Sequence, residues 1–120
     1  MYMSPTLFGL NLTFVTPLAK ALGPSYFRVG GTHADYAIFQ EKNSTVDKGQ
    51  YVFSFKLLDE TYSFVQNAGW RLIFDLNDML RTNETSTGRW NSSNAQLFLN
   101  YTSQKGYELD FELGNGFWVW

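Results

Sequence analysis

The carboxylates of the last strand-like segment are the residues of this chain best placed to do chemistry. Residues 107–116 read YELDFELGNG, and alternation along a strand would place Glu108, Asp110 and Glu112 on one face. Carboxylates at a strand end are candidates for general acid–base work. Position 116 has the parity of Glu112, so a side chain there would face the same way, but the residue is glycine.

Other candidate sites are weaker. His33 and Asp35 have an H-x-D spacing, but metal sites need three or four ligands, and the chain has one histidine and no cysteine, so no metal is expected. Gly30-Gly31 lacks the full glycine fingerprint of a nucleotide site. Asn77 and Asp78 either line a cleft or cap a helix that begins near Met79.

The elements that must position these residues repeat as helix, glycine, strand. A short helix around 18–22, with Pro17 at its first position, precedes the strand YFRV. A second helix over 57–68 ends at Gly69 before RLIFDL. A third, capped by Ser92 or Ser93 and ending at Gly106, precedes the acidic strand. Its expected apolar face consists of Ala95, Leu97, Phe98 and Tyr101.

Strands alternating with helices of this length indicate an α/β fold with about three parallel βα units, part of a (β/α)8 TIM barrel. The strand Leu72–Ile73–Phe74 is apolar at consecutive positions, as a strand covered on both faces would be. Each strand ends in a polar or glycine-rich corner: GGTHAD, DLND and ELGN. Ligands bind at the carboxyl ends of strands in such folds, so all three corners should lie on the binding side.

The composition limits the classes of partner that this protein is expected to bind. The net charge is −2 and the nine basic residues are scattered, which disfavours nucleic acid and weakens binding to a strongly sulfated polymer. No stretch has the length of a transmembrane helix, and the N-terminus does not resemble a signal peptide. Five N-x-S/T sequons favour passage through the secretory pathway. They lie at Asn11, Asn43, Asn83, Asn91 and Asn100.

Three stretches in order carry a resemblance to a known family. SYFRVGGTHAD, LIFDLNDMLRT and WNSSNAQLFLNYTSQKGYELDFELGN resemble glycoside hydrolase family 79, the heparanase family of retaining endo-β-glucuronidases, over about 17 to 115. The resemblance implies a (β/α)8 barrel with a small β-sandwich, a secretory and lysosomal route, heparan sulfate or a related glycan as partner, and no cofactor. It also implies that the fourth strand continues as ELGNEP, whose second glutamate is the general acid/base.

A comparison residue by residue shows that only some of the family's functional positions have matching residues in this sequence. Asn115 matches the family asparagine near the substrate 2-hydroxyl, and Thr32 matches a cleft residue. Gly116 occupies the acid/base position. The family nucleophile lies on a later strand than the three strands predicted for this sequence. Retaining hydrolysis needs two carboxyls about 5 to 5.5 Å apart. Asp110 and Glu112 are close enough, but they point in parallel, so they are not expected to substitute.

Around residues 40–56 the family has an excised linker and a basic heparin-binding segment, where this chain has QEKNSTVDKGQYVFSFK. The interpretation is therefore an incomplete barrel over residues 1–115 with a non-family tail at 116–120, inactive alone. The alternative is a non-catalytic glycan-binding homologue. A hydrolase completed by a partner chain ranks last.

Overall fold

The computed structural model describes residues 6–7, 10–41, 50–83 and 87–116. Short elements open the described part: β1 (Thr6–Leu7), β2 (Leu10–Asn11) and α1 (Leu12–Ala21). They are followed by β3 (Tyr26–Val29), α2 (Thr32–Asp35), β4 (Ala37–Gln40), β5 (Tyr51–Ser54) and α3 (Phe55–Ala68). The last elements are β6 (Arg71–Leu76), α4 (Ser93–Lys105) and β7 (Asp110–Leu113).

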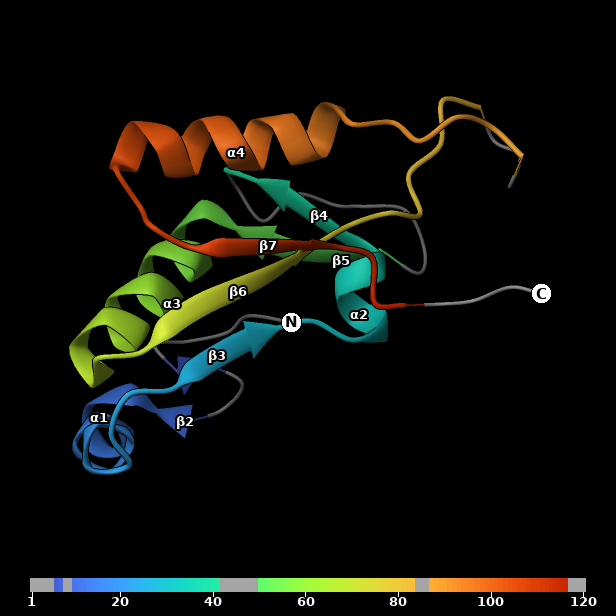
Figure 1. Ribbon diagram of the computed structural model, residues 1–120. Coiled ribbons are helices and arrows are strands. Elements are labelled where there is room, and N and C mark those ends of the chain that lie inside the picture. Colours follow the sequence, from blue (N-terminus) through green and yellow to red (C-terminus); the bar gives the residue numbers. More distant parts are fainter. Residues whose placement is uncertain (1–5, 8–9, 42–49, 84–86, 117–120) are drawn as a thin grey trace.

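The central feature is a parallel sheet in the order β3–β6–β7, with β6 in the middle (Figure 1). The α/β prediction with three parallel units is confirmed: β3, β6 and β7 are the three predicted strands. The helices α3 and α4 precede β6 and β7, so each crosses from one parallel strand to the next. This arrangement is compatible with a run of successive units of a β/α barrel.

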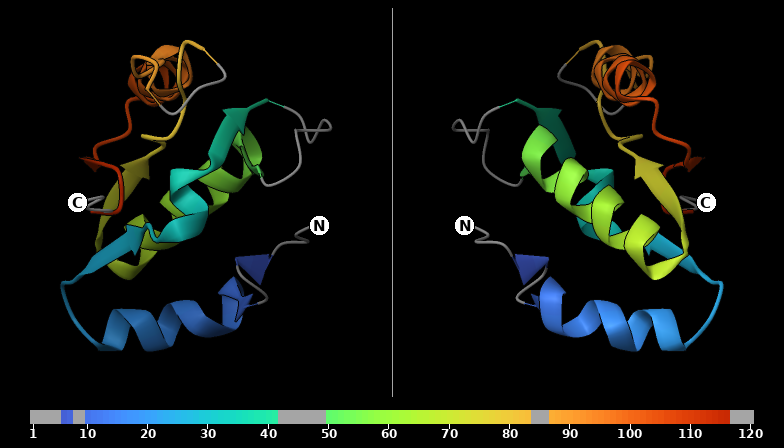
Figure 2. Two further views of the ribbon diagram at one scale, coloured as in Figure 1. Left: turned by 90° about the vertical axis from the view of Figure 1, so that its right-hand side faces the viewer. Right: turned by 90° about the vertical axis from the view of Figure 1, so that its left-hand side faces the viewer.

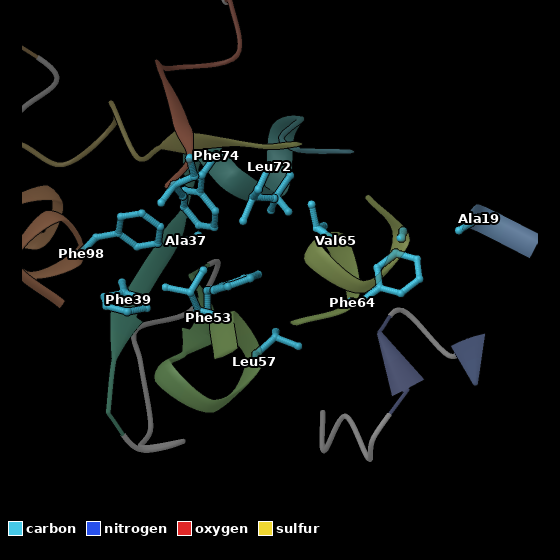
Figure 3. Close-up of a cluster of buried hydrophobic side chains, with 14 residues drawn as sticks. Ala19, Ala37, Phe39, Phe53, Leu57, Phe64, Val65, Leu72, Phe74 and Phe98 are labelled. Carbon is cyan, nitrogen blue, oxygen red and sulfur yellow. The ribbon is translucent and has the colours of Figure 1, made fainter. Parts of the chain in front are cut away.

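The hydrophobic core lies between one face of this sheet and the helices. Leu72 and Phe74 of β6 point into it, and Phe74 stacks on Phe98 of α4 with ring centroids 4.1 Å apart (Figure 3). The opposite face of β6 carries Arg71, Ile73 and Asp75 by alternation. Ile73 is only half-buried, so the expectation of a strand covered on both faces holds for one face of the described sheet.

Four strands of the described part were not predicted from the sequence: β1, β2, β4 and β5. β4 and β5 form a separate parallel pair beside α4 and α3, in the register Phe39↔Phe53. Phe39 and Phe53 are both almost fully buried, and Phe39 packs on Phe98 of α4. The signal was present in the aromatic and β-branched run YVFS at 51–54, which is typical of strands.

The first helix was predicted too short. α1 begins at Leu12, and the Asn11 side chain accepts a hydrogen bond from the Phe14 N–H, as a helix-capping residue does. Pro17 therefore lies inside the helix and not at its first position. The Asn11 cap fixes the helix start earlier than the proline does. Figure 2 shows α1 as a separate layer below the sheet.

The two longer helices end where glycine was expected to end them. Gly69 and Gly106 adopt left-handed backbone angles, with φ of 73° and 66°, and their N–H groups bond back to the last helical turn. Leu97 is 41% exposed, so its assignment to the buried face of α4 was wrong. No helix begins near Met79: residues 77–80 are irregular, and Asn77 instead accepts from the Met79 N–H.

Candidate functional site at the strand ends

The carboxyl ends of β3, β6 and β7 meet at one edge of the sheet, as predicted from the three corners (Figure 1). We call the residues that follow these strands the strand-end rim: Gly30–Asp35, Asn77–Asp78 and Gly114–Gly116. The Gly114 N–H donates to the Leu76 carbonyl at 3.1 Å, and the Asn115 N–H donates to Asp35 Oδ1 at 2.8 Å. The rim therefore consists of segments far apart in sequence and joined by hydrogen bonds.

Asn115 is held by Arg28 of β3 and by Asp35 of the rim. Its side-chain oxygen accepts a hydrogen bond from an Arg28 terminal nitrogen at 2.9 Å, in addition to the backbone bond to Asp35. Within the described part of the chain its side-chain nitrogen donates to no acceptor. The Asn115 amide is thus oriented by its oxygen and can offer its N–H groups to a ligand.

Thr32 is exposed at the first residue of α2, directly after Gly31. Gly31 has φ 95°, which favours glycine and lets the chain turn from β3 into α2. Asp35, at the end of the same short helix, is fully buried and holds Asn115. The Asp35 bond therefore ties the segment that carries Thr32 to the segment that carries Asn115.

Sequence reasoning missed the charged layer below the rim. Arg28 of β3 reaches across β6 to Glu112 of β7, with Nε 2.7 Å from Oε2, and one of its terminal nitrogens lies 3.8 Å from Asp75. Asp75 and Glu112 are direct partners in the β6–β7 register. The strand register is the signal from which the Asp75–Glu112 pair could have been predicted, because neighbouring parallel strands place register partners on the same face of the sheet.

Asp75 is fully buried although it carries a carboxylate. Its pKa is raised to about 6, first by burial and next by the nearby Asp35 carboxylate, while the Arg28 guanidinium opposes the rise. Glu112 and Asp78 contribute smaller effects in the upward direction. A carboxyl with this pKa takes up its proton in the mildly acidic range, well above the range of an ordinary aspartate.

The acidic-strand predictions hold in part. Glu112 contacts Arg28, and Asp110 pairs with Arg71 at the opposite end of the sheet, at 2.5 and 2.8 Å. These two carboxylates therefore have separate arginine partners. Phe111 and Leu113 are 43% and 57% exposed, so the apolar face of β7 is less covered than expected.

The parity argument for position 116 fails. The strand ends at Leu113, and Gly114 and Gly116 both have positive φ, so regular alternation stops before the corner. Gly116 is exposed, and a Cβ built there would have no heavy atom within 4 Å. A side chain at 116 would therefore have room, at the cost of a left-handed backbone.

The remaining candidates have ordinary structural roles. His33 is exposed, with its ring centroid 6.4 Å from that of Tyr51. Across the described ranges, no three His, Cys, Asp or Glu side chains converge as metal ligands would. Asn77 donates to the Ala37 carbonyl at 2.8 Å, so its side chain joins β6 to β4.

Four of the five sequons lie in the described part. Asn11, Asn83 and Asn100 are exposed and Asn91 is half-buried, while Asn43 lies outside the described residues. In the described part, no helix combines the length and apolar character needed to span a bilayer.

A parallel β/α sheet whose polar strand ends are hydrogen-bonded into one rim is the arrangement in which α/β enzymes place their clefts. The family model of the N-terminal domain of glycosyl hydrolase family 79 matches residues 4–118. The chain therefore belongs to glycoside hydrolase family 79.

Three relatives show the range of the similarity. Mouse heparanase is 33% identical over 151 positions, covering 84% of this chain and 28% of that protein. The hyaluronoglucuronidase of Hirudo nipponia is 30% identical, covering 82% of this chain and 26% of its own length. Mouse inactive heparanase-2 is 39% identical over 64 residues, 53% of this chain and 10% of that protein. The chain thus spans about a quarter of the first two relatives.

Proposed function

We propose that the strand-end rim forms part of the glycan-binding cleft of a family 79 glucuronidase barrel. Thr32 and Asn115 are the proposed ligand contacts. The observation that carries the proposal is the placement of Asn115: its oxygen is held by Arg28, its backbone by Asp35, and its amide N–H groups face no protein acceptor among the described residues. Such an amide suits a sugar hydroxyl, which can accept as well as donate.

The proposed ligand is a glycan that contains glucuronic acid. Support comes from the relatives, which include heparanases of several mammals and a hyaluronoglucuronidase. Their names describe two different polymers, so the comparison favours the class of glucuronide glycans over any one member of it. Heparan sulfate is one member of this class.

We further propose that residues 1–120 alone do not hydrolyse the glycan. The family resemblance puts the acid/base glutamate at position 116, where this chain has glycine, and puts the nucleophile on a later strand. Asp75 and Glu112 are adjacent carboxylates with different environments, but Asp75 has no exposed surface to reach a glycosidic oxygen. In this proposal residues 1–115 form the barrel part, and the sequence departs from the family's ELGNEP motif from Gly116 on.

The competing candidate is a non-catalytic glycan-binding homologue. Mouse inactive heparanase-2 supports it, because that protein has the highest of the three identities described above, over a shorter stretch. Both candidates share the binding step and differ in whether the barrel to which this sequence belongs turns over its glycan.

The binding step is tested by calorimetric titration of the purified chain with glucuronic-acid-containing oligosaccharides. Asn115→Ala and Thr32→Ala should each weaken binding by about fivefold or more, the loss expected for one or two ligand hydrogen bonds. Asn100→Ala, exposed on α4, is the matched control and should leave the affinity unchanged. Equal affinity in all three variants and the unaltered chain would refute the rim assignment.

The catalytic part has its own readout. New reducing ends should not appear when the chain is incubated with the same oligosaccharides, and their appearance would refute the inactivity proposal.

We also propose a secretory route, supported by the exposed Asn11, Asn83 and Asn100. Secretion from cultured animal cells should give a product whose mass falls on treatment with an N-glycan-releasing enzyme; an unchanged mass would count against use of the sequons.

A further inference from the structure

A leucine on the outer side of α4 is exposed although the helix has a well-defined core face. Ala95, Phe98 and Thr102 are the buried residues of this helix. Leu97 lies away from them and is 41% exposed. The helix forms an outer layer of the described part, with the sheet on its inner side (Figure 1). Single exposed leucines are common, so the meaning of this one depends on its neighbours.

A sequon asparagine stands about one helical turn after Leu97. Asn100 is followed by Tyr101 and Thr102, which completes an N-x-T sequon. Residues three apart on a helix are neighbours, with Cβ atoms about 5 to 6 Å apart. Helical side chains also lean toward the helix N-terminus, so Asn100 covers surface over the turn that carries Leu97. A group attached to the Asn100 amide therefore starts directly beside the exposed leucine.

The Asn100 carboxamide is available for such an attachment. It is exposed, and it has no hydrogen-bond partner in the described part of the chain. Asn91, by contrast, is half-buried, and its side-chain oxygen accepts from the Ser93 N–H at 3.1 Å. Asn11 caps α1 through its side-chain oxygen. A substituent on the Asn100 amide nitrogen therefore displaces no contact within the described residues.

The rest of this sequon is engaged in the folded chain. Thr102 is 3% exposed, and its hydroxyl donates to the Leu99 carbonyl at 3.0 Å. The Tyr101 hydroxyl donates to the Asp59 carboxylate. Neither side chain is presented to a modifying enzyme once α4 has packed, so attachment of a sugar at this sequon must precede folding.

We propose that Asn100 is N-glycosylated and that the first sugar of its glycan packs over Leu97 and shields it from water. This inference rests on the proposed secretory route and adds to it a site and a structural role. In the attachment, the Asn100 amide nitrogen attacks C1 of the first N-acetylglucosamine of a lipid-linked oligosaccharyl diphosphate. A C–N bond forms, the bond from C1 to the diphosphate oxygen breaks, and the nitrogen loses one proton.

The chemistry of this sugar suits the surface beside Asn100. N-acetylglucosamine presents ring C–H groups and an acetyl methyl group as well as hydroxyls. The apolar groups can cover Leu97 without a fixed geometry, because the hydrophobic effect is non-directional. Gln96 is exposed on the same turn, and its amide can donate to or accept from the polar groups of the sugar.

The first test measures occupancy of the sequon. The full chain is secreted from cultured animal cells behind a cleavable leader, its glycans are released with an amidase, and its peptides are analysed by mass spectrometry. The amidase converts a glycosylated asparagine to aspartate, so the peptide that contains Asn100 should have the mass of the aspartate form. Asn100→Gln should remove one glycan from the intact mass. An unmodified Asn100 would overturn the proposal.

The second test measures the contact with Leu97. In the secreted chain, Asn100→Gln should lower the Tm by about 3 to 5 °C, the shift expected when part of a leucine returns to water in a domain of this size. In a Leu97→Ala background most of this shift should vanish. Leu99→Ala is the matched control, because Leu99 is 39% exposed but lies one residue before Asn100 and does not face it. The full shift should remain in that background.

The chain made in bacteria, without glycans, separates the effect of the sugar from that of the side chain. There Asn100→Gln should leave the Tm nearly unchanged, and a loss equal to that in the secreted chain would overturn the role of the glycan. A Tm shift that survives Leu97→Ala would overturn the packing. Glycans at other sequons with none at Asn100 would overturn the site and leave the secretory route intact. A chain with no glycan at any sequon would refute the route as well.

Discussion

Arg28 and Glu112 stand on the two strands that flank β6, and their side chains meet over it, with Arg28 Nε 2.7 Å from Glu112 Oε2. Arg28 pairs in register with Ile73, and Ile73 with Asp110, so the arginine reaches two residues further along β7 to contact Glu112 on the same face. The contact brings three strands together at their carboxyl ends and places a positive charge above Asp75.

Glu112→Gln should lower the pKa of Asp75. Glu112 raises this pKa directly, and its loss also leaves Arg28 freer to interact with Asp75, so both effects act in one direction. The cost in unfolding free energy should be below about 1 kcal/mol, because both side chains of the pair are partly exposed. Carbon NMR of the Asp75 carboxyl during a pH titration measures the effect; a pKa that stays the same or rises would contradict it.

Asp75 should make the protein less stable as the pH rises through the acidic range. Its folded-state pKa of about 6 lies above the ordinary 3.8, so between these values the folded chain holds a proton that the unfolded chain releases. The contribution is fully present below pH 3.8 and is lost as the pH passes about 6. The loss should amount to at most about 3 kcal/mol, from about 1.4 kcal/mol for each pKa unit.

Urea denaturation of the native chain and of Asp75→Asn isolates this contribution. The amide cannot ionise, so the difference in unfolding free energy between the two proteins should shift in favour of the variant as the pH rises. Other carboxylates titrate in both proteins and cancel in the difference. A difference that is flat from pH 3.8 to about 6 would show that Asp75 does not titrate in this window.

The three parallel strands and the two longer helices could be predicted because local signals and tertiary packing agree there. In α3 the Ser54 side chain accepts from the Leu57 N–H, apolar residues recur at helical spacing, and Gly69 takes the left-handed turn. β4 and β5 were missed because each has only four residues, and their pairing depends on burial of Phe39 and Phe53 against other elements.

The rim could be predicted as a location but not as a set of contacts. The strand-end corners follow from chain order alone, since parallel strands end on one side. The contact of Arg28 with Glu112 spans 84 residues and depends on register, which the sequence pattern does not fix to one position. The direction that a side chain at position 116 would take could not be predicted, because positive φ at Gly114 and Gly116 ends the alternation of side chains along β7.

Asn94→Ala should destabilise the contact between α4 and β4. The Asn94 side chain accepts from the Phe39 N–H at 2.9 Å and donates to the Phe39 carbonyl at 2.8 Å, so it pairs with β4 as a neighbouring strand would. Removing it should lower the unfolding free energy by about 1 to 2 kcal/mol, because two backbone groups lose their partner. Asn100→Ala on the same helix is the control, and equal losses in both variants would contradict the pairing role.

Gly114→Ala should cost more than its backbone angle alone explains. Gly114 and Gly106 have similar positive φ, 75° and 66°, so an alanine at either position pays about 1 kcal/mol for the left-handed conformation. A Cβ at 106 meets nothing within 4 Å, whereas a Cβ at 114 overlaps the Asp78 carboxylate. Thermal denaturation should therefore show a larger loss for Gly114→Ala than for Gly106→Ala.

The Asp78→Ala change tests the cause of that extra loss. In the double variant the Cβ at 114 no longer meets a carboxylate, so the cost of Gly114→Ala should fall to that of Gly106→Ala. The two residues would then show a coupling free energy of about 1 kcal/mol or more, as neighbours in contact do. Strictly additive losses would mean that the Asp78 side chain turns aside freely from a Cβ at position 114.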